Sequence, residues 1–289
     1  MAGILALLAS STSRAQDSGL GTKTSLDAEF RFSMIGSSEF KERSTEGKVD
    51  GYDLSTQEVL SIELKQGILA RVGFDLGRYN FGVPHGAALP DKLQTTAMVF
   101  GADFQIGEAW IVRVEAQPGY YGGSTRLRGG NFDVPITVGG SYFVSADLQL
   151  VAGISIDPER KYPVLPGAGF RWKFAGDWTL DAILPTPRIE YTLSNTIMLY
   201  AGGDLQGGTY RVDPDFGDEH GNPKLNNAVV DYTQIRVGGG ASWKIRPELT
   251  LEFEAGVVTV QDFDFHRADV KARSTDIPPY GGLVLKASF

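Results

Sequence analysis

LDAEFRFSM, residues Leu26 to Met34, alternates between apolar and polar side chains at every position. Successive side chains of a β-strand point to opposite faces, so in a strand the apolar set and the charged set of this stretch separate completely. A helix would mix the two sets, because its faces repeat every 3.6 residues. The stretch therefore predicts a strand with one apolar face and one polar, charged face.

The same alternation recurs along the rest of the chain, and no segment after Thr22 holds a helical period. It is clearest in residues 68–76, 110–117, 148–157, 170–174, 234–243 and 249–257. Repeated strands of this kind, without helices between them to carry a crossover, predict an all-β fold of antiparallel neighbours.

The connections between these strands alternate between short and long. The short ones have the size of hairpin turns and are residues 65–67, 106–108, 145–147, 175–177, 194–195 and 246–248. The others are mostly longer and polar, at residues 36–47, 81–91, 122–132, 158–163, 214–227 and 266–279. Short turns at one rim and long loops at the other are typical of barrels that cross a membrane. We predict an antiparallel up-and-down transmembrane β-barrel of about 14 strands.

Residues 178–193 leave the strand number open. Pro185 and Pro187 divide this segment into two arms. Each arm is shorter than the roughly 9–11 residues that a tilted membrane-spanning strand needs. If the two arms do not cross, about twelve strands remain.

The composition excludes several other classes of protein. The chain has 289 residues with 27 Lys and Arg, 35 Asp and Glu, a net charge of −8 and no Cys. The lack of Cys excludes disulfide scaffolds, thiol nucleophiles and zinc sites built from Cys. An acidic chain also lacks the basic surface that binding to nucleic acid requires. The mean hydropathy of −0.12 resembles that of a soluble protein, because apolar and charged residues cancel in the average.

The N-terminus has features of an export signal. Residues 3–9 are apolar, and Ser13 and Ala15 are small residues at the −3 and −1 positions of a cleavage site. No basic residue precedes the apolar run, as expected if the start of the signal is truncated. We expect residues 1–15 to be a signal peptide and residues 16–289 to form a single barrel domain.

A soluble sandwich or a lipocalin-type barrel would also alternate, with its apolar face turned inward. Three features favour the membrane barrel: the dense charge on the polar face, the export signal, and aromatic residues beside the short turns. The aromatic residues in these positions are Trp110, Trp172, Phe174, Trp178 and Trp243.

The last strand, Tyr280 to Phe289, ends in Phe and carries Leu283 and Leu285 at alternate positions. It resembles the C-terminal recognition strand of Gram-negative outer-membrane barrels, which the barrel-assembly machinery reads. Ala287 stands where a bulky residue is more usual. The resemblance implies that Leu283, Leu285 and Phe289 form an assembly signal.

Residues 178–191, and most specifically their Leu-Pro-x-Pro-Arg-Ile-Glu-Tyr segment at 184–191, resemble a group of uncharacterised outer-membrane β-barrel proteins classed as a domain of unknown function. The resemblance covers most of the mature chain. It implies an outer-membrane location and a barrel fold, and it supplies no catalytic residues.

If the apolar faces meet lipid, the charged faces line the lumen. Two interpretations stay open: a lumen closed by ion pairs, or a hydrated channel with a transverse field that selects small polar solutes. The lumen-lining candidates are Glu29, Arg31, Arg71, Asp75, Arg113, Glu115, Arg171, Lys173, Arg188, Glu190, Arg236, Glu252 and Glu254.

Neither catalysis nor metal binding has a strong signal. His85, His220 and His266 all fall in predicted loops, without the strand-borne Ser that a hydrolase site would place beside them. One loop concentrates the carboxylates Asp213, Asp215, Asp218 and Glu219 but lacks the twelve-residue calcium pattern. We expect no enzymatic activity, no cofactor and no metal, with this loop as the one weak calcium candidate.

The sequence therefore predicts an outer-membrane pore or transporter for small polar solutes, exported through the periplasm. The alternatives are a structural or recognition barrel with a closed lumen, or a lipid-modifying outer-membrane enzyme. The expected partners are outer-membrane lipid and lipopolysaccharide, and the assembly machinery during biogenesis. We expect a monomer that binds no nucleic acid.

Overall fold

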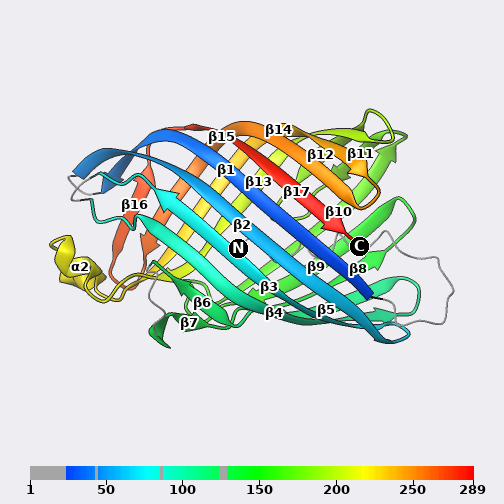
Figure 1. The fold of residues 1–289 in the computed structure, drawn as a ribbon, viewed down its shortest axis with the longest axis horizontal. Helices are drawn as coiled ribbons and strands as arrows, with labels where there is room; N and C mark the ends of the chain where they lie inside the picture. The colour runs from blue at the N-terminus through cyan, green and yellow to red at the C-terminus, as the bar shows by residue number, and fades with distance from the viewer. Residues whose placement is uncertain (1–23, 43–44, 85–86, 124–128) are drawn as a thin grey trace.

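One antiparallel sheet closes on itself to form a barrel in the computed structural model, which describes residues 24–42, 45–84, 87–123 and 129–289 (Figure 1). The predicted signal peptide and His85 lie outside the described residues. The strands are β1 (Thr24–Glu42), β2 (Thr45–Lys65), β3 (Ile68–Phe81), β4 (Lys92–Ile106), β5 (Trp110–Ala116), β6 (Gly119–Gly122), β7 (Phe132–Asp133), β8 (Ile136–Phe143), β9 (Leu148–Ile156), β10 (Val164–Ala175), β11 (Trp178–Asp181), β12 (Arg188–Thr192), β13 (Ile197–Arg211), β14 (Val229–Arg246), β15 (Leu249–Phe265), β16 (Val270–Ser274) and β17 (Pro279–Ser288). Three short helices lie in the loops: η2 (Gly129–Asn131), α2 (Phe216–Glu219) and η3 (Pro223–Leu225).

These segments fill fourteen strand positions in the wall. Three of the positions are interrupted and consist of two segments each. β5 and β6 both pair with β4, and β16 and β17 both pair with β15. β8 pairs with β5 and β7 pairs with β6, so β7 and β8 together form the next position. The barrel closes where β1 pairs with β17, from Asp27 opposite Ser288 to Ile35 opposite Tyr280. The predicted all-β, up-and-down architecture is confirmed.

The strand number is fourteen, so the alternative of twelve is wrong. β11 and β12 are short, but β11 pairs with β10 and β12 pairs with β13. Together they form a hairpin that continues the wall. The two prolines therefore shorten this hairpin without removing it from the sheet.

The apolar face of each strand points outward and the charged face points inward. Along β1, Phe30 and Met34 are 43 % and 62 % exposed, whereas Ser33 between them is fully buried. This orientation is opposite to that of a lipocalin-type barrel. No helix among the described residues is long and apolar enough to cross a membrane.

All six predicted short turns lie at one end of the barrel, called here the turn end; the opposite end is the loop end. The aromatic residues predicted beside the turns are exposed there. Trp110 packs on Tyr142 with ring centroids 4.6 Å apart, and Trp178 packs on Tyr191 at 4.8 Å. Large aromatic rings thus form part of the outer surface at the turn end.

Four predicted long loops contain regular structure, and one of them, residues 122–132, holds η2 and the first residue of β7. Residues 36–47 were expected to be a loop, but the ladder between β1 and β2 continues through them from Ser38 opposite Val49 to Glu42 opposite Thr45. An irregularity between Ile35 and Ser38 shifts the register, and the simple alternation of the sequence is lost at that point. Residues 266–279 contain β16, and residues 214–227 contain α2 and η3.

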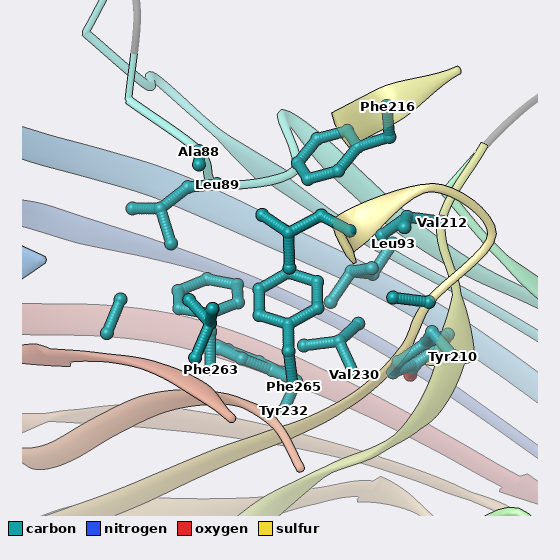
Figure 2. Packing of buried hydrophobic residues seen from close by; sticks show 14 of the residues in the cluster. Ala88, Leu89, Leu93, Tyr210, Val212, Phe216, Val230, Tyr232, Phe263 and Phe265 are labelled. Atoms are coloured by element: carbon teal, nitrogen blue, oxygen red, sulfur yellow. The ribbon is translucent and has the colours of Figure 1, made fainter. Parts of the chain in front are cut away.

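A core of buried apolar residues, called here the apolar cap, fills the loop end (Figure 2). Strand extensions supply Phe81, Tyr232 and Phe263, and the loop around α2 adds Phe216. The ring centroid of Phe263 lies 5.0 Å from that of Phe81 and 4.9 Å from that of Tyr232. Between the apolar cap and the turn end, the inner face of the wall is charged. The interior of the barrel therefore changes along its axis from polar at the turn end to a packed apolar core at the loop end.

The sheet narrows around the apolar cap. At this end β6 pairs with β4 and, through Gly122 opposite Arg211, with β13. The Gly123 amide and the Asn131 side-chain amide both donate to the Arg211 carbonyl oxygen, at 3.1 Å and 2.9 Å. A ring of β1, β2, β3, β4, β6, β13, β14, β15 and β16 therefore encloses the cap, and β8 to β12 end below it.

Truncation of a cap ring should loosen the loop end. Phe263→Ala removes a fully buried ring and should lower the free energy of unfolding by about 3–5 kcal/mol. Phe253→Ala, on the same strand but half exposed on the outer face, should cost clearly less. Urea unfolding of the two refolded variants in detergent, followed by tryptophan fluorescence, measures the difference. Equal losses would show that the cap is not a packed core.

Candidate functional site

The lumen below the apolar cap contains a cavity of about 770 Å³. Its walls carry ten acidic and seven basic side chains, an excess of three acidic groups. It reaches the turn end, where Glu248 and Ser288 line it, and it extends toward the loop end as far as Tyr210 of the apolar cap. The inner face that the alternation predicted therefore surrounds a space large enough to hold water.

Arg236 is the most deeply buried charge of this inner face. Its guanidinium donates to Ser33 Oγ at 2.8 Å and to Gln234 Oε1 at 3.1 Å, and it forms an ion pair with Asp53. The centre of the guanidinium lies 5.0 Å from the centroid of the Tyr280 ring. Strands far apart in the chain thus meet at one fully buried cation directly below the cap.

Arg31 holds a second group of charges on the same side. Its Nη1 lies 2.7 Å from Asp204 Oδ2 and 3.9 Å from Glu254 Oε1, and its Nη2 lies 3.6 Å from Glu29 Oε1. Gln206 donates to Asp204 Oδ2 at 2.6 Å. Arg31 therefore faces three carboxylates. One of them, Glu254, also lies 4.0 Å from Arg236 Nη1, and acidic groups still outnumber basic ones in this part of the lumen.

A third group lies on β10 to β12 and β15. Arg171 donates to Glu190 Oε2 at 2.5 Å and to Asp181 Oδ2 at 2.6 Å, and Arg188 Nε donates to Glu190 Oε1 at 2.8 Å. Arg188 Nη1 also lies 3.9 Å from Glu252 Oε2. The short β11–β12 hairpin is fastened to its neighbours through these charges as well as through its backbone.

The opposite wall, β3 to β5, carries its own network. Arg113 makes a two-point contact with Asp103, with N–O distances of 2.5 Å and 2.6 Å. Arg71 donates to Ser61 Oγ at 3.3 Å, and its Nε lies 3.6 Å from Glu115 Oε2. These side chains are nearly inaccessible, so they form a packed polar layer on the wall.

Pairing is what makes these inward charges tolerable. An unpaired ion in a poorly hydrated site costs several kcal/mol, and opposite charges with good hydrogen bonds offset much of that cost. Asp75 is different, because no ion pair joins it within the described part of the chain, although it lines the cavity. Its carboxylate is available to interact with a solute or with water.

The predicted lumen residues fall into three groups. One is exposed beside a short turn and does not line the cavity: Lys173. Four are buried in the polar layers of the wall: Arg113, Glu115, Glu190 and Arg236. Eight line the cavity: Glu29, Arg31, Arg71, Asp75, Arg171, Arg188, Glu252 and Glu254.

Nine of the charged residues that line the cavity were missing from the predicted set, and three of them illustrate why. Asp53 alternates with the outward Tyr52 and Leu54, a signal that was present in the sequence. Asp204 follows Gly202 and Gly203, so only Leu205 after it is apolar, and this weak alternation hid its strand. Lys286, in the last strand, donates to Glu252 Oε1 at 3.0 Å.

The other candidate groups have local partners. His220 Nδ1 lies 2.7 Å from the Phe216 carbonyl oxygen, and His266 Nδ1 lies 3.5 Å from Asp231 Oδ2. In the acidic loop, Asp213 is only partly exposed, and Asp215, Asp218 and Glu219 are exposed. Within the described residues no three potential metal ligands stand close enough to hold an ion.

The predicted assembly signal lies on the outer face of the closing strand. Leu283, Leu285 and Phe289 are all exposed, and the backbone groups of Phe289 and Leu26 exchange two hydrogen bonds of 2.9 Å. The C-terminal residue is thus part of the seam between the two ends of the sheet.

Removal of the central cation should destabilise the barrel strongly. Arg236→Met leaves Asp53 buried without its ion pair, so the free energy of unfolding should fall by about 3–5 kcal/mol. Lys173→Met, which removes an exposed cation from the turn end, should change it by less than about 0.5 kcal/mol. Denaturant unfolding in detergent compares them, and similar small losses would show that the Arg236 pair carries no net stability.

Comparison with curated proteins gives no match. Among solved structures, an outer membrane channel from Pseudomonas putida F1 aligns at 11 % identity with a TM-score of 0.49, covering 95 % of this chain and all of that one. A mutant of the TodX monoaromatic hydrocarbon channel aligns at 9 % identity and a TM-score of 0.40, covering 94 % and 91 % of the two chains. A Pseudomonas aeruginosa FadL homologue aligns at 8 % and 0.39, covering 92 % and 90 %.

A family model matches a longer stretch of the sequence than the motif at 184–191. The match runs over residues 85–280, from within the connection between β3 and β4 to the start of the closing strand. It confirms the resemblance inferred from that motif. Because the match spans more than half of the chain, the protein belongs to the family described as a domain of unknown function, DUF6268.

Proposed function

We propose that this protein is an outer-membrane channel for small polar solutes, with its turn end toward the periplasm. The outward apolar faces and the exposed aromatic rings at the turn end support insertion in a bilayer. Short turns on the periplasmic side and long loops outside are the usual arrangement of such barrels. The proposal assigns the wall to lipid contact and the lumen to the solute.

The observation that carries the proposal is the charged cavity in the lumen. Its volume of about 770 Å³ is space that the wall side chains leave free, and it extends to the turn end. Charges of both signs on its walls would favour water and polar solutes over apolar ones. A solute the size of a few water molecules up to a small metabolite matches this volume.

The acidic excess of the cavity lining should make the channel select solutes by the sign of their charge. Arg31 faces three carboxylates, and Asp75 has no ion pair in the described part of the chain. The local potential should therefore favour cations over anions. This selectivity would be modest, because seven basic groups line the same cavity.

The apolar cap supports a second candidate, a barrel with a closed lumen whose loops do the work. Tyr232, Phe263 and their neighbours fill the loop end along the axis. A barrel sealed in this way would have a structural or recognition role, as a folded platform for the loop around α2. Measurement of conductance separates the two candidates.

Reconstituted into planar bilayers, the protein should conduct and should prefer K⁺ to Cl⁻. The combined variant Glu29→Gln and Asp75→Asn removes two carboxylates from the lining and should bring the reversal potential in a KCl gradient closer to zero. Asp218→Asn, at an exposed position of α2, is the matched control and should leave it unchanged.

Folded protein that shows heat-modifiable migration on a gel but carries no current would favour the closed barrel. Conduction with an unchanged reversal potential in the combined variant would place selectivity elsewhere than at these two carboxylates.

A further inference from the structure

The polarity of the two faces of the sheet reverses toward the loop end. At the level of the cavity, the outward side chains are apolar and the inward ones are charged. On the strands that enclose the apolar cap, the inward side chains are apolar and buried, and the outward side chains that alternate with them are polar. The barrel therefore has two outer surfaces of opposite character, at two levels along its axis.

β2 shows the reversal within one continuous strand. Leu54 is 40 % exposed on the outer face, and Asp53 beside it is buried and lines the cavity. Further along the same strand, Lys48 is exposed on the outer face and Val49 is fully buried in the apolar cap. The apolar face of β2 is thus outside at one level and inside at the next.

On β3 the change takes place over a few residues. The exposed Leu76 is followed on the same face by the exposed Arg78. On the inner face, Tyr79 packs against the apolar cap and Phe81 belongs to it. The neighbouring strands β2 and β3 therefore reverse together.

β16 repeats the pattern, because the exposed Lys271 and Arg273 alternate with Val270 and Ala272, which are buried in the apolar cap. Lys271 Nζ and Arg273 Nε lie 3.3 Å and 2.6 Å from the carboxylate oxygens of Asp262 on β15. The side chains of the two cations are 48 % and 61 % exposed, so these ion pairs lie on the outer face within reach of water.

Aromatic rings mark the level of the reversal on β1 and β2. Tyr52, the last apolar outward residue of β2 before the charged ones, is 45 % exposed. Its ring centroid lies 6.5 Å from that of Phe32 on β1. Aromatic residues of membrane barrels gather at both interfaces of the bilayer, and the rings at the turn end already occupy one of them. The pair of Tyr52 and Phe32 fits the other.

The outward apolar run has the length of a membrane-spanning strand. It covers residues 26–34 on β1, 235–243 on β14 and 249–257 on β15, nine in each. A tilted strand needs about 9–11 residues to cross the hydrocarbon of a bilayer. The strands continue past this length, and their extensions are the parts that enclose the apolar cap.

The charges decide which of the two outer surfaces lipid can cover. Lys and Arg side chains on the lipid face of a barrel are strongly unfavourable deep in the bilayer and tolerated only near its edge. A buried apolar interior with charged side chains outside is the pattern of a protein in water. The cap level has this second pattern, and the cavity level has the pattern of a membrane barrel.

We propose that the bilayer ends at the level of the reversal. Lipid acyl chains then contact only the apolar belt, defined by the outward side chains of residues 26–34, 235–243 and 249–257 and of the same level on the other strands. Beyond it a charged collar projects into the headgroups and water outside the outer leaflet. The collar is formed by Lys48, Arg78, Asp262, Asp264, Lys271 and Arg273.

The apolar cap is then a folded part outside the bilayer, carried by strands that continue through the membrane. The charged cavity is the part of the lumen that lies at bilayer level. The inference rests on the insertion in a bilayer that the proposed function contains, and it adds where the bilayer ends.

The absence of Cys from the sequence permits a direct test with single-cysteine variants that carry a nitrobenzoxadiazole fluorophore. Leu54→Cys and Phe253→Cys place the label on the belt, and Lys48→Cys and Lys271→Cys place it on the collar. Glu108→Cys, in an exposed short turn, is the matched control. Each label is read in phosphatidylcholine nanodiscs, which leave both sides open to the solution. Doxyl lipid is the quencher in the bilayer, and iodide is the quencher in water.

Doxyl lipid should remove most of the fluorescence from the two belt labels, and iodide should remove most of it from the two collar labels and from Glu108→Cys. Equal quenching by doxyl lipid at Lys48→Cys and Leu54→Cys would show that lipid covers the collar and would overturn the inference. Quenching by iodide alone at all five positions would show that the belt is not inserted, and would remove the proposed channel as well. The expected quenching in a protein that carries no current would remove the channel and leave the boundary in place.

Charge substitutions on β2 test the same boundary without a label. Leu54→Lys puts a charge on the belt and should reduce the fraction of protein that refolds into lipid vesicles, measured as heat-modifiable migration on a gel. Asp50→Lys, at an exposed position of the same face at the cap level, is the matched control and should refold like the original chain. Equal refolding of the two variants, whether high or low, would overturn a boundary between these positions.

Discussion

The hydrogen bonds between β1 and β17 close the sheet on itself, and closure is the constraint on which the other features depend. A sheet with one apolar and one charged face has no stable orientation in either water or lipid while it stays open. Once it closes, the apolar faces meet the outside and the charged faces meet one another across a small lumen. Two backbone hydrogen bonds between Leu26 in β1 and Phe289, just after β17, are part of this closure.

Closure forces the charges together, and their pairing sets the character of the lumen. Arg236 is satisfied by Asp53, Ser33 and Gln234, from strands that are distant in the chain. Arg31, in contrast, faces more carboxylate than it can neutralise. The first arrangement stabilises the wall, and in the proposed channel the second would leave a negative potential for a solute. The same residue type would then have a structural role at one level of the barrel and a role toward solutes at another.

The upper part of the barrel resolves a different conflict. The strands of one side extend past the charged level and enclose the apolar cap, and those of the other side, β8 to β12, stop below it. The sheet therefore changes height between β10 and β13, where the short β11–β12 hairpin stands.

The sequence alone determined the fold class, the two faces and the turns. The period of two from Leu26 to Met34, repeated in the other strands, requires an apolar and a charged face whatever the partners are. A hairpin turn such as residues 65–67 depends only on residues adjacent in the chain, so the turns could also be predicted from the sequence. The family assignment, through the motif at 184–191, also came from the sequence.

The tertiary structure decided which charges meet, where the strands end and what closes the loop end. Asp53 and Arg236 are separated by 183 positions, and no local pattern relates them. The register irregularity between Ile35 and Ser38 interrupted the alternation, so the strand beyond it read as a loop. The cap takes single apolar residues such as Phe216 and Leu225 from loops that are polar on average. Periodicity records the environment of a residue relative to its neighbours in the chain, whereas pairing across the barrel and burial of loops depend on contacts that only closure creates.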